Sequence, residues 1–409
     1  MKKCFFKDRL ITYIAVFIII GSNIFRFDNL FLLDKLFTFL SLIIVLIVPF
    51  GLNIKRKMMP LLCALFFVFG LIIVNTFYHN IINNGSLLIV FLVKIIVVAL
   101  LLGKYVERAV SVFEIISNIF LVILLLNVLQ TLFFPGILGT RDGNNLYLVG
   151  SNYNNFGGVY FIGVFASWIL AKSDKKYRWL YWGQLFLSFL SVILMGSITS
   201  AVAFFIIILY SVLQKSKIVQ RLAPLLLIIS VIIFLNFVVL KSNVAVLSGM
   251  DIINMFLGET GKDITFSGRL YIWDNAMQVI EQNPVLGVGY YQSGEWAELH
   301  LSAVNSHNAI LDVLIVGGWT LLAFLVFLIL KLYIKIYKTI KSEYFWGIVF
   351  FSSVFLLMMQ FEVYSYFIIS LFVLLVYISR FCTKFLKDNN FYISRNNENT
   401  CDRGQWFYR

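Results

Sequence analysis

Long apolar runs dominate the chain, and short polar segments separate them. Most runs extend over about 17 to 25 residues, the length that an α-helix needs to cross the hydrocarbon core of a bilayer. The pattern predicts an all-α, polytopic membrane protein with about twelve transmembrane helices. They would form a single integral membrane domain over residues 1–381, followed by a polar cytoplasmic tail over 382–409. The predicted spans are residues 10–25, 36–52, 60–78, 86–103, 113–134, 155–171, 179–196, 199–214, 222–240, 307–330, 344–361 and 363–380.

Composition and charge agree with this interpretation. Hydrophobic residues make up 61% of the chain and charged residues only 13%, whereas about a quarter of a typical soluble domain is charged. If the N-terminus is cytoplasmic, 26 of the 33 lysines and arginines fall on the cytoplasmic side and 5 on the outer side. Because basic residues concentrate in cytoplasmic loops, the net charge of +13 indicates orientation, with both termini cytoplasmic, and not nucleic-acid binding.

Two of the predicted outer connections differ from the other, shorter ones. The segment 135–155 is rich in glycine and asparagine, which predicts a turn-rich loop. The segment of about 241–306 is the only long connection, and connections of that length are usually functional or disordered. It contains tryptophans, tyrosines and a helical pattern, so we expect it to be a folded external loop that contains short helices.

The stretch TFSGRLYIWDNAMQVIEQNPVLGVGYY, residues 265–291, carries that helical pattern. Ser267 is a suitable N-cap for a helix, Arg269 would lie in its first turn, and Pro284 would end it. The N–H groups of a helix N-terminus and a guanidinium would together form a binding site for a pyrophosphate. The alternative is an ion pair between Arg269 and Asp274 or another acid of the loop.

A second polar element, VNSHNAILDVLIVGGW at residues 304–319, opens the tenth predicted span. Ser306 or Asn305 would cap the helix and place His307 in its first turn, where the helix dipole favours neutral imidazole. A neutral histidine there is a candidate general base for a sugar hydroxyl, and the alternative is a structural histidine. Asp312 is a candidate functional carboxylate within the span, or else a hydrogen-bond partner of Asn308.

Further candidates lie upstream of these two elements. Arg141 lies in the Gly/Asn-rich loop, and the following SNYNNFGG supplies Asn152 and Asn155, which would either cap the next span or bind sugar hydroxyls. Lys94 lies within the fourth predicted span, where it would snorkel, pair with Asp312 or bind a lipid phosphate.

Several common chemical motifs are absent from the sequence. It contains no Asp-x-Asp pair, no Walker loop, no CxxC pair and no His/Cys cluster, so we expect no metal and no other cofactor. An external glycosyl-transfer site without nucleotide or metal needs an activated donor. A sugar linked to a polyprenyl pyrophosphate, held by arginines at the membrane surface, meets that requirement.

Taken together, the two motifs resemble the O-antigen ligase and polymerase superfamily of bacterial surface-polysaccharide enzymes. The family pattern combines a Ser-Gly-Arg, a tryptophan four residues later, a Pro-x-x-Gly-x-Gly turn, and a His-Asn that opens a span with glycines. The matching residues are Ser267, Gly268, Arg269, Trp273, Pro284, Gly287, Gly289, His307, Asn308, Gly317 and Gly318. One departure is the segment 195–205, where family members often carry a Ser-Arg and this chain has no arginine.

The resemblance implies a metal-independent glycosyltransferase in a bacterial cytoplasmic (inner) membrane, with its active site on the external face. His307 would activate the acceptor hydroxyl, and Arg269 and Arg141 would hold and neutralise the leaving pyrophosphate. Residues around them would bind substrate: Ser267, Gly268, Trp273, Asn308, Asn152, Asn155 and Asp312.

Within that superfamily we favour polymerisation of undecaprenyl-pyrophosphate-linked oligosaccharide repeat units into an O-antigen of lipopolysaccharide or into capsule or exopolysaccharide. The alternatives are a ligase that transfers lipid-linked glycan to lipid A core or protein, and a transporter or flippase of the lipid-linked unit. One dominant loop argues against the symmetric halves of a transporter. The implied partners are the lipid-linked oligosaccharide and the bilayer, with a chain-length regulator and a flippase as further candidates and no nucleic acid.

Overall fold

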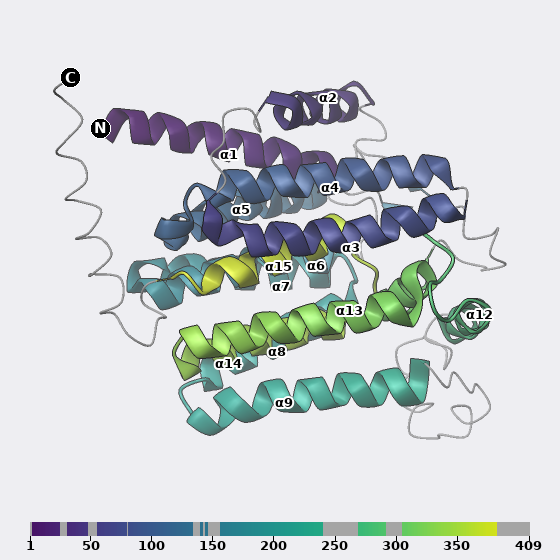
Figure 1. Cartoon of the computed structure of the whole chain (residues 1–409). Helices are drawn as coiled ribbons and strands as arrows, with labels where there is room; N and C mark the ends of the chain where they lie inside the picture. The colour runs from purple at the N-terminus through teal and green to yellow at the C-terminus, as the bar shows by residue number, and fades with distance from the viewer. Residues whose placement is uncertain are drawn as a thin grey trace.

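A computed structural model describes residues 2–24, 31–47, 55–79, 81–133, 140–141, 144–145, 156–239, 269–291 and 305–382. These residues form a bundle of helices that run roughly side by side (Figure 1). The larger helices of the bundle are α1 (Lys2–Ile24), α2 (Phe31–Ile47), α3 (Met59–Tyr78), α4 (Ile82–Gly103), α5 (Ala109–Phe133), α6 (Phe156–Ser173), α7 (Arg178–Leu194), α8 (Ile198–Leu213), α9 (Lys217–Phe234), α13 (Ala309–Thr339), α14 (Ser342–Met358) and α15 (Tyr366–Ser379).

The predicted all-α fold is confirmed, and each predicted span overlaps one of these helices. Short elements complete the described chain: α12 (Arg269–Gln282), the 3-10 turns η2 (Arg56–Met58), η3 (Val106–Arg108) and η5 (Lys175–Tyr177), the π-helical η6 (Leu235–Val239), and the paired two-residue strands β1 (Thr140–Arg141) and β2 (Asn144–Asn145). Six helices of the described chain are long and apolar enough to cross a membrane, so the protein is a multi-pass membrane protein. The number of twelve crossings stays a prediction.

Helix α6 forms the centre of the bundle. Its residues from Phe156 to Leu170 are all buried, and α5, α7, α14 and α15 pack around it. A helix that is apolar all round is expected in the interior of a large membrane bundle. By contrast, α9 lies at the edge of the bundle in Figure 1, and most of its apolar side chains are exposed. In a bilayer those exposed side chains would contact lipid.

Helix α12 differs from the others because it lies across one end of the bundle, where Figure 1 shows it end-on. Leu270, Trp273, Ala276 and Ile280 form its buried face, whereas its other face is largely polar and exposed. The helix ends at Gln282, two residues before Pro284, as the sequence predicts. The helix predicted within the long connection is therefore confirmed.

The turn after α12 docks into a break in α13. Gly318 has a φ of +61° and interrupts the helix, which leaves backbone groups without helical partners. The turn supplies some of those partners, since the Trp319 N–H donates to the carbonyl of Pro284 and the Val288 N–H donates to the carbonyl of Ile315. The Pro-x-x-Gly-x-Gly turn and the paired glycines of α13 thus form one backbone junction that fixes α12 against the bundle.

We expect Gly287→Ala to destabilise the protein strongly. Gly287 has a φ of +66°, which costs an L-residue about 1–2 kcal/mol. In addition, a Cβ there would overlap the carbonyl oxygen of Ile315 and the amide nitrogens of the α13 break. The measurement is the thermal unfolding temperature of the purified protein in detergent. Gly70→Ala is the matched control, because a Cβ at Gly70 meets nothing within 4 Å and its unfolding temperature should not fall. Equal behaviour of the two variants would contradict the junction.

Candidate functional site

Three charged or titratable side chains from distant parts of the sequence meet where α12 lies across the bundle. Arg269 is the first residue of α12, and its Nη2 donates to Oε1 of Glu362 at 2.6 Å. Glu362 lies in the connection between α14 and α15, and its side chain is only 7% exposed. His307 approaches the other carboxylate oxygen, with 3.6 Å between its Nδ1 and Oε2 of Glu362. One buried carboxylate therefore faces both the guanidinium and the imidazole.

His307 has an unusual backbone conformation. Its φ of +50° is the only positive value at a non-glycine residue of the described chain. Such conformations cost about 1–3 kcal/mol and are often found at functional sites. The imidazole Nδ1 is buried and has no hydrogen-bond partner among the described residues, although the side chain as a whole is 21% exposed. Because Nδ1 faces Glu362, Nε2 is the ring nitrogen that is left for a bound hydroxyl.

A network of hydrogen bonds holds the His307 turn on several sides. Trp273 of α12 is fully buried, and its Nε1 donates to the carbonyl of Ser306 at 2.9 Å. The Ser306 hydroxyl donates to Oδ1 of Asp312 at 2.6 Å, and Asn308 donates its amide to the carbonyl of Gln360 at the end of α14. Because α12, α13 and α14 all contribute, the positive φ of His307 is fixed by its surroundings.

The electrostatics of this group centre on Glu362. Its carboxylate balances the Arg269 guanidinium, and each of its oxygens faces one basic group. The arrangement combines a donor for an anion, a partly exposed imidazole and a carboxylate that orients both.

Comparison with known proteins gives two matches. Residues 183–326 match the Wzy_C family, described as O-antigen ligase. A second match is to the exopolysaccharide production protein ExoQ of Rhizobium meliloti (strain 1021), with 25% identity over 103 residues. The aligned region covers 22% of this chain and only 24% of ExoQ.

Over these residues the chain is similar to the O-antigen ligase and polymerase superfamily. The region that matches the O-antigen ligase family extends from α7 into α13 and so includes Arg269, Trp273 and His307. Glu362 lies beyond it. The matched range therefore contains two members of the charged group, and the third lies outside it.

The predicted start of the helix at the His307 segment is wrong. The N-cap of α13 is Asn308, whose Oδ1 accepts from the N–H groups of Ile310 and Leu311, so His307 precedes the helix and does not lie in its first turn. Asn305 and Ser306, the two expected caps, make other hydrogen bonds. The Asn305 side chain accepts the His307 N–H, and the Ser306 hydroxyl donates to Asp312. The Asp312 carboxylate accepts from Ser306, whereas the bond to Asn308, one of the two roles that the sequence offers for Asp312, is made by the backbone, from the Asp312 N–H to the Asn308 carbonyl.

The other predicted site residues have different outcomes. Arg269 forms an ion pair, as one of the two interpretations expects, but its partner Glu362 is not an acid of the same loop. Arg141 lies in β1 opposite Asn144, and its side chain is outside what the structure describes. Lys94 is buried, and its ammonium donates to Ser22 at 3.1 Å. The remaining predicted residues lie outside the described residues: Asn152, Asn155, Ser267 and Gly268.

Glu362 is the functional candidate that sequence reasoning missed. One signal was present, because Glu362 is the single residue between the last two predicted spans, on the predicted outer face. A lone carboxylate in so short a turn is a candidate functional group. Among the described residues, no three His, Cys, Asp or Glu side chains gather in a group that would hold a metal ion.

Proposed function

We propose that this protein is a polymerase of lipid-linked oligosaccharide repeat units in the assembly of a bacterial surface polysaccharide. The observation that carries this proposal is the convergence of Arg269, Glu362 and His307 at one end of a membrane bundle. A cation beside a partly exposed imidazole, at the membrane surface, suits a donor that is activated by a polyprenyl pyrophosphate.

In the proposed step, a hydroxyl of the acceptor glycan attacks the anomeric carbon of the donor sugar. A new carbon–oxygen bond forms as the bond between that carbon and the pyrophosphate oxygen breaks, and the bonding electron pair leaves with the pyrophosphate. Nε2 of His307 takes the hydroxyl proton and later releases it to water. Sugar, proton and charge therefore balance without metal, nucleotide or redox partner.

Arg269 supports this step because negative charge grows on the leaving pyrophosphate. A guanidinium offers two parallel donors that suit a phosphate group, and it lies at the N-terminus of α12, where the helix dipole also favours an anion. Glu362 holds Arg269 before the donor binds, and it faces His307 Nδ1, where a carboxylate stabilises the imidazolium. Arg141, Ser267 and Gly268 are proposed to complete the pyrophosphate site, and Asn152 and Asn155 the sugar site.

Trp273, Asn308 and Asp312 have a supporting role in this proposal. Each bonds to the turn that carries His307 or caps the helix behind it; Trp273 and Asn308 are buried and Asp312 is partly buried. They hold the imidazole in place, which a proton transfer requires, since small displacements of a catalytic group reduce the rate strongly. This differs from the direct substrate contacts that the sequence resemblance implies for them.

The proposed setting is the outer face of the cytoplasmic membrane, with both chain termini in the cytoplasm. The strong bias of lysine and arginine toward one side supports that orientation. Undecaprenyl-pyrophosphate-linked oligosaccharide is the proposed donor and acceptor, and a flippase would have to supply it on that face.

A ligase is the second candidate, because the matched family is described as O-antigen ligase. The two functions share the donor and differ in the acceptor, which is a lipid-linked repeat unit for a polymerase and a lipid A core or a protein for a ligase. The name of ExoQ, an exopolysaccharide production protein, supports polymerisation.

The test is the size distribution of glycan from native cells whose only copy of the gene carries Arg269→Ala, with the amount of protein checked. For a polymerase, the ladder of long chains disappears while single repeat units still reach the surface. For a ligase, surface glycan disappears and long lipid-linked chains accumulate. An unchanged ladder would overturn both candidates.

A further inference from the structure

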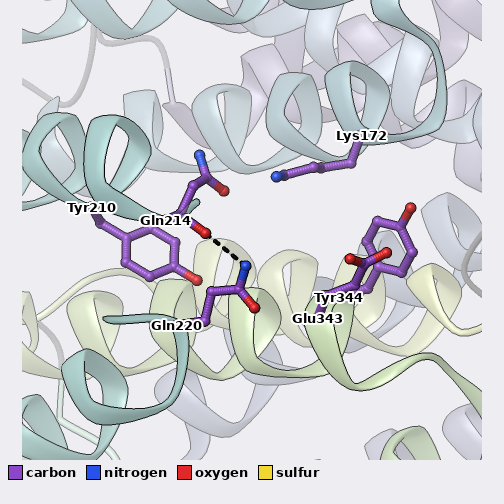
Figure 2. A pocket seen from close by; sticks show the side chains of 6 residues that line it. All are labelled: Lys172, Tyr210, Gln214, Gln220, Glu343 and Tyr344. Carbon is purple, nitrogen blue, oxygen red and sulfur yellow. Dashed lines mark hydrogen bonds between the residues drawn. The ribbon is translucent and has the colours of Figure 1, made fainter. Parts of the chain in front are cut away.

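A polar cavity lies at the end of the bundle opposite to His307. Its volume is about 100 Å³, enough for several water-sized groups, since one water needs roughly 10–15 Å³. Figure 2 shows the six side chains that line it: Lys172, Tyr210, Gln214, Gln220, Glu343 and Tyr344. They come from the last turn of α6, the end of α8, and the first turns of α9 and α14. Because α14 ends beside Glu362, the two sites are separated by the length of that helix.

The charges of this cavity are arranged as a pair on opposing walls. In Figure 2 the Lys172 ammonium extends from one wall, while the Glu343 carboxylate faces the same space from another. The amide groups of Gln214 and Gln220 and the phenol of Tyr210 lie beside them, across the cavity. One cationic and one anionic group, with neutral donors and acceptors beside them, suit a ligand that is itself dipolar.

Contacts beneath the cavity fix the position of its walls. The ring of Tyr210 stacks on Phe350 of α14 with 3.6 Å between centroids and an interplanar angle of 10°. The Gln220 amide donates to the carbonyl of Gln214 at 2.6 Å, which closes the α8–α9 connection. Lys172 lies 6.0 Å from the ring centre of Trp168. The cavity is therefore built from packed helix ends, which limits the reorganisation that binding would cost.

The surroundings of the cavity favour a lipid as its occupant. The four helices end here, which is where the head groups of one leaflet would lie around a membrane bundle. Exposed apolar side chains continue from the cavity along α8 and α9, where acyl chains would lie. They include Leu209, Val212, Leu213, Ile218, Leu222 and Leu225.

We propose that this cavity binds the head group of a zwitterionic phospholipid with a primary ammonium, phosphatidylethanolamine. The phosphate lies toward Lys172 and the ammonium lies toward Glu343. An ammonium with three N–H groups fits Glu343 and the neighbouring amides, whereas a trimethylated ammonium offers no such donors. The site is independent of the glycosyl-transfer proposal, because it rests on a different set of residues at the other end of the bundle.

The test is lipid retention by the full-length protein, measured by native mass spectrometry after addition of equal amounts of phosphatidylethanolamine, phosphatidylglycerol and phosphatidylcholine. The wild type should retain phosphatidylethanolamine about fivefold better than the other two, as expected for one extra charge pair near the surface. Glu343→Gln should remove this preference and leave phosphatidylglycerol binding unchanged. Lys172→Met should weaken the retention of both phosphatidylethanolamine and phosphatidylglycerol.

Lys175→Met is the matched control, because Lys175 lies in η5 close to Lys172 in sequence and does not line the cavity. It should retain all three lipids as the wild type does. Glu343 is exposed, so its replacement should leave folding intact even if Lys172→Met does not fold. Equal retention of the three lipids by the wild type would overturn the proposal, as would an unchanged preference in Glu343→Gln. Displacement of the lipid by an equal concentration of soluble phosphoethanolamine would also overturn it, because acyl chains would then contribute nothing.

Discussion

Replacing His307 by asparagine should lower the rate of glycosyl transfer by about 10²–10⁴-fold, the range that general acid–base catalysis usually contributes. Asparagine suits this test because it tolerates a positive φ better than most residues, so the backbone at +50° should remain as it is. It cannot accept the hydroxyl proton at Nε2, and this is the function that the proposal assigns to His307. The measurement is single-turnover release of polyprenyl pyrophosphate by purified protein with a synthetic lipid-linked repeat unit.

His79→Asn is the control for this prediction. His79 follows α3 and stacks edge-on against Tyr78, and it has no part in the proposed step. This variant should release pyrophosphate at the wild-type rate. A wild-type rate in His307→Asn would remove His307 from the mechanism. Loss of activity accompanied by a lower unfolding temperature than that of His79→Asn would instead point to a structural histidine.

Local sequence patterns predicted most of the elements and part of the site. The amphipathic spacing of α12 and the break at Pro284 are properties of neighbouring residues, and both are confirmed. The helical nature of the apolar runs follows from the same kind of information, since backbone groups in lipid must bond within their own segment. Arg269 and His307 were found because they lie at the ends of such elements.

Long-range contacts were the part that sequence patterns did not predict. Arg269 and Glu362 are separated by 93 positions, and no periodicity connects them. The identity of the α13 N-cap also depended on distant groups, because Gln360 binds Asn308. The break in α13 at Gly318 also could not be predicted from local sequence. The helix can break there, with Gly318 at a positive φ, because the distant turn after α12 supplies hydrogen-bond partners for the freed backbone groups.

This geometry shows why the Arg-containing and His-containing motifs occur together. The junction between the 284–289 turn and the α13 break fixes α12, while Trp273 joins α12 directly to the His307 turn through Ser306. The distance between Arg269 and His307 is therefore set by two separate sets of contacts. A pyrophosphate and an attacking hydroxyl need such a fixed spacing, because orientation contributes much of the rate in transfer reactions.

The second prediction concerns the ion pair between Arg269 and Glu362. We expect variants of this pair to change the stability of the protein and the rate of glycosyl transfer independently. Arg269→Gln should abolish most glycosyl transfer, because removing one donor to a developing negative charge typically costs about 10²–10³ in rate. It should also destabilise the protein by roughly 3 kcal/mol, because it leaves the Glu362 carboxylate buried without its partner. The two measurements are pyrophosphate release and the thermal unfolding temperature in detergent.

The double variant Arg269→Gln/Glu362→Gln tests whether these two effects have different causes. It removes both charges, so the unfolding temperature should return toward that of the wild type, while the rate stays as low as in Arg269→Gln alone. Glu362→Gln alone is the reference, because Glu362 also faces His307. If Arg269 only held the fold together, the double variant would be stable and would release pyrophosphate as fast as Glu362→Gln, which would contradict a direct role of the guanidinium on the pyrophosphate. Recovery of stability with a rate well below that of Glu362→Gln would mean that Glu362 balances Arg269 in the resting protein and that the guanidinium acts on the substrate.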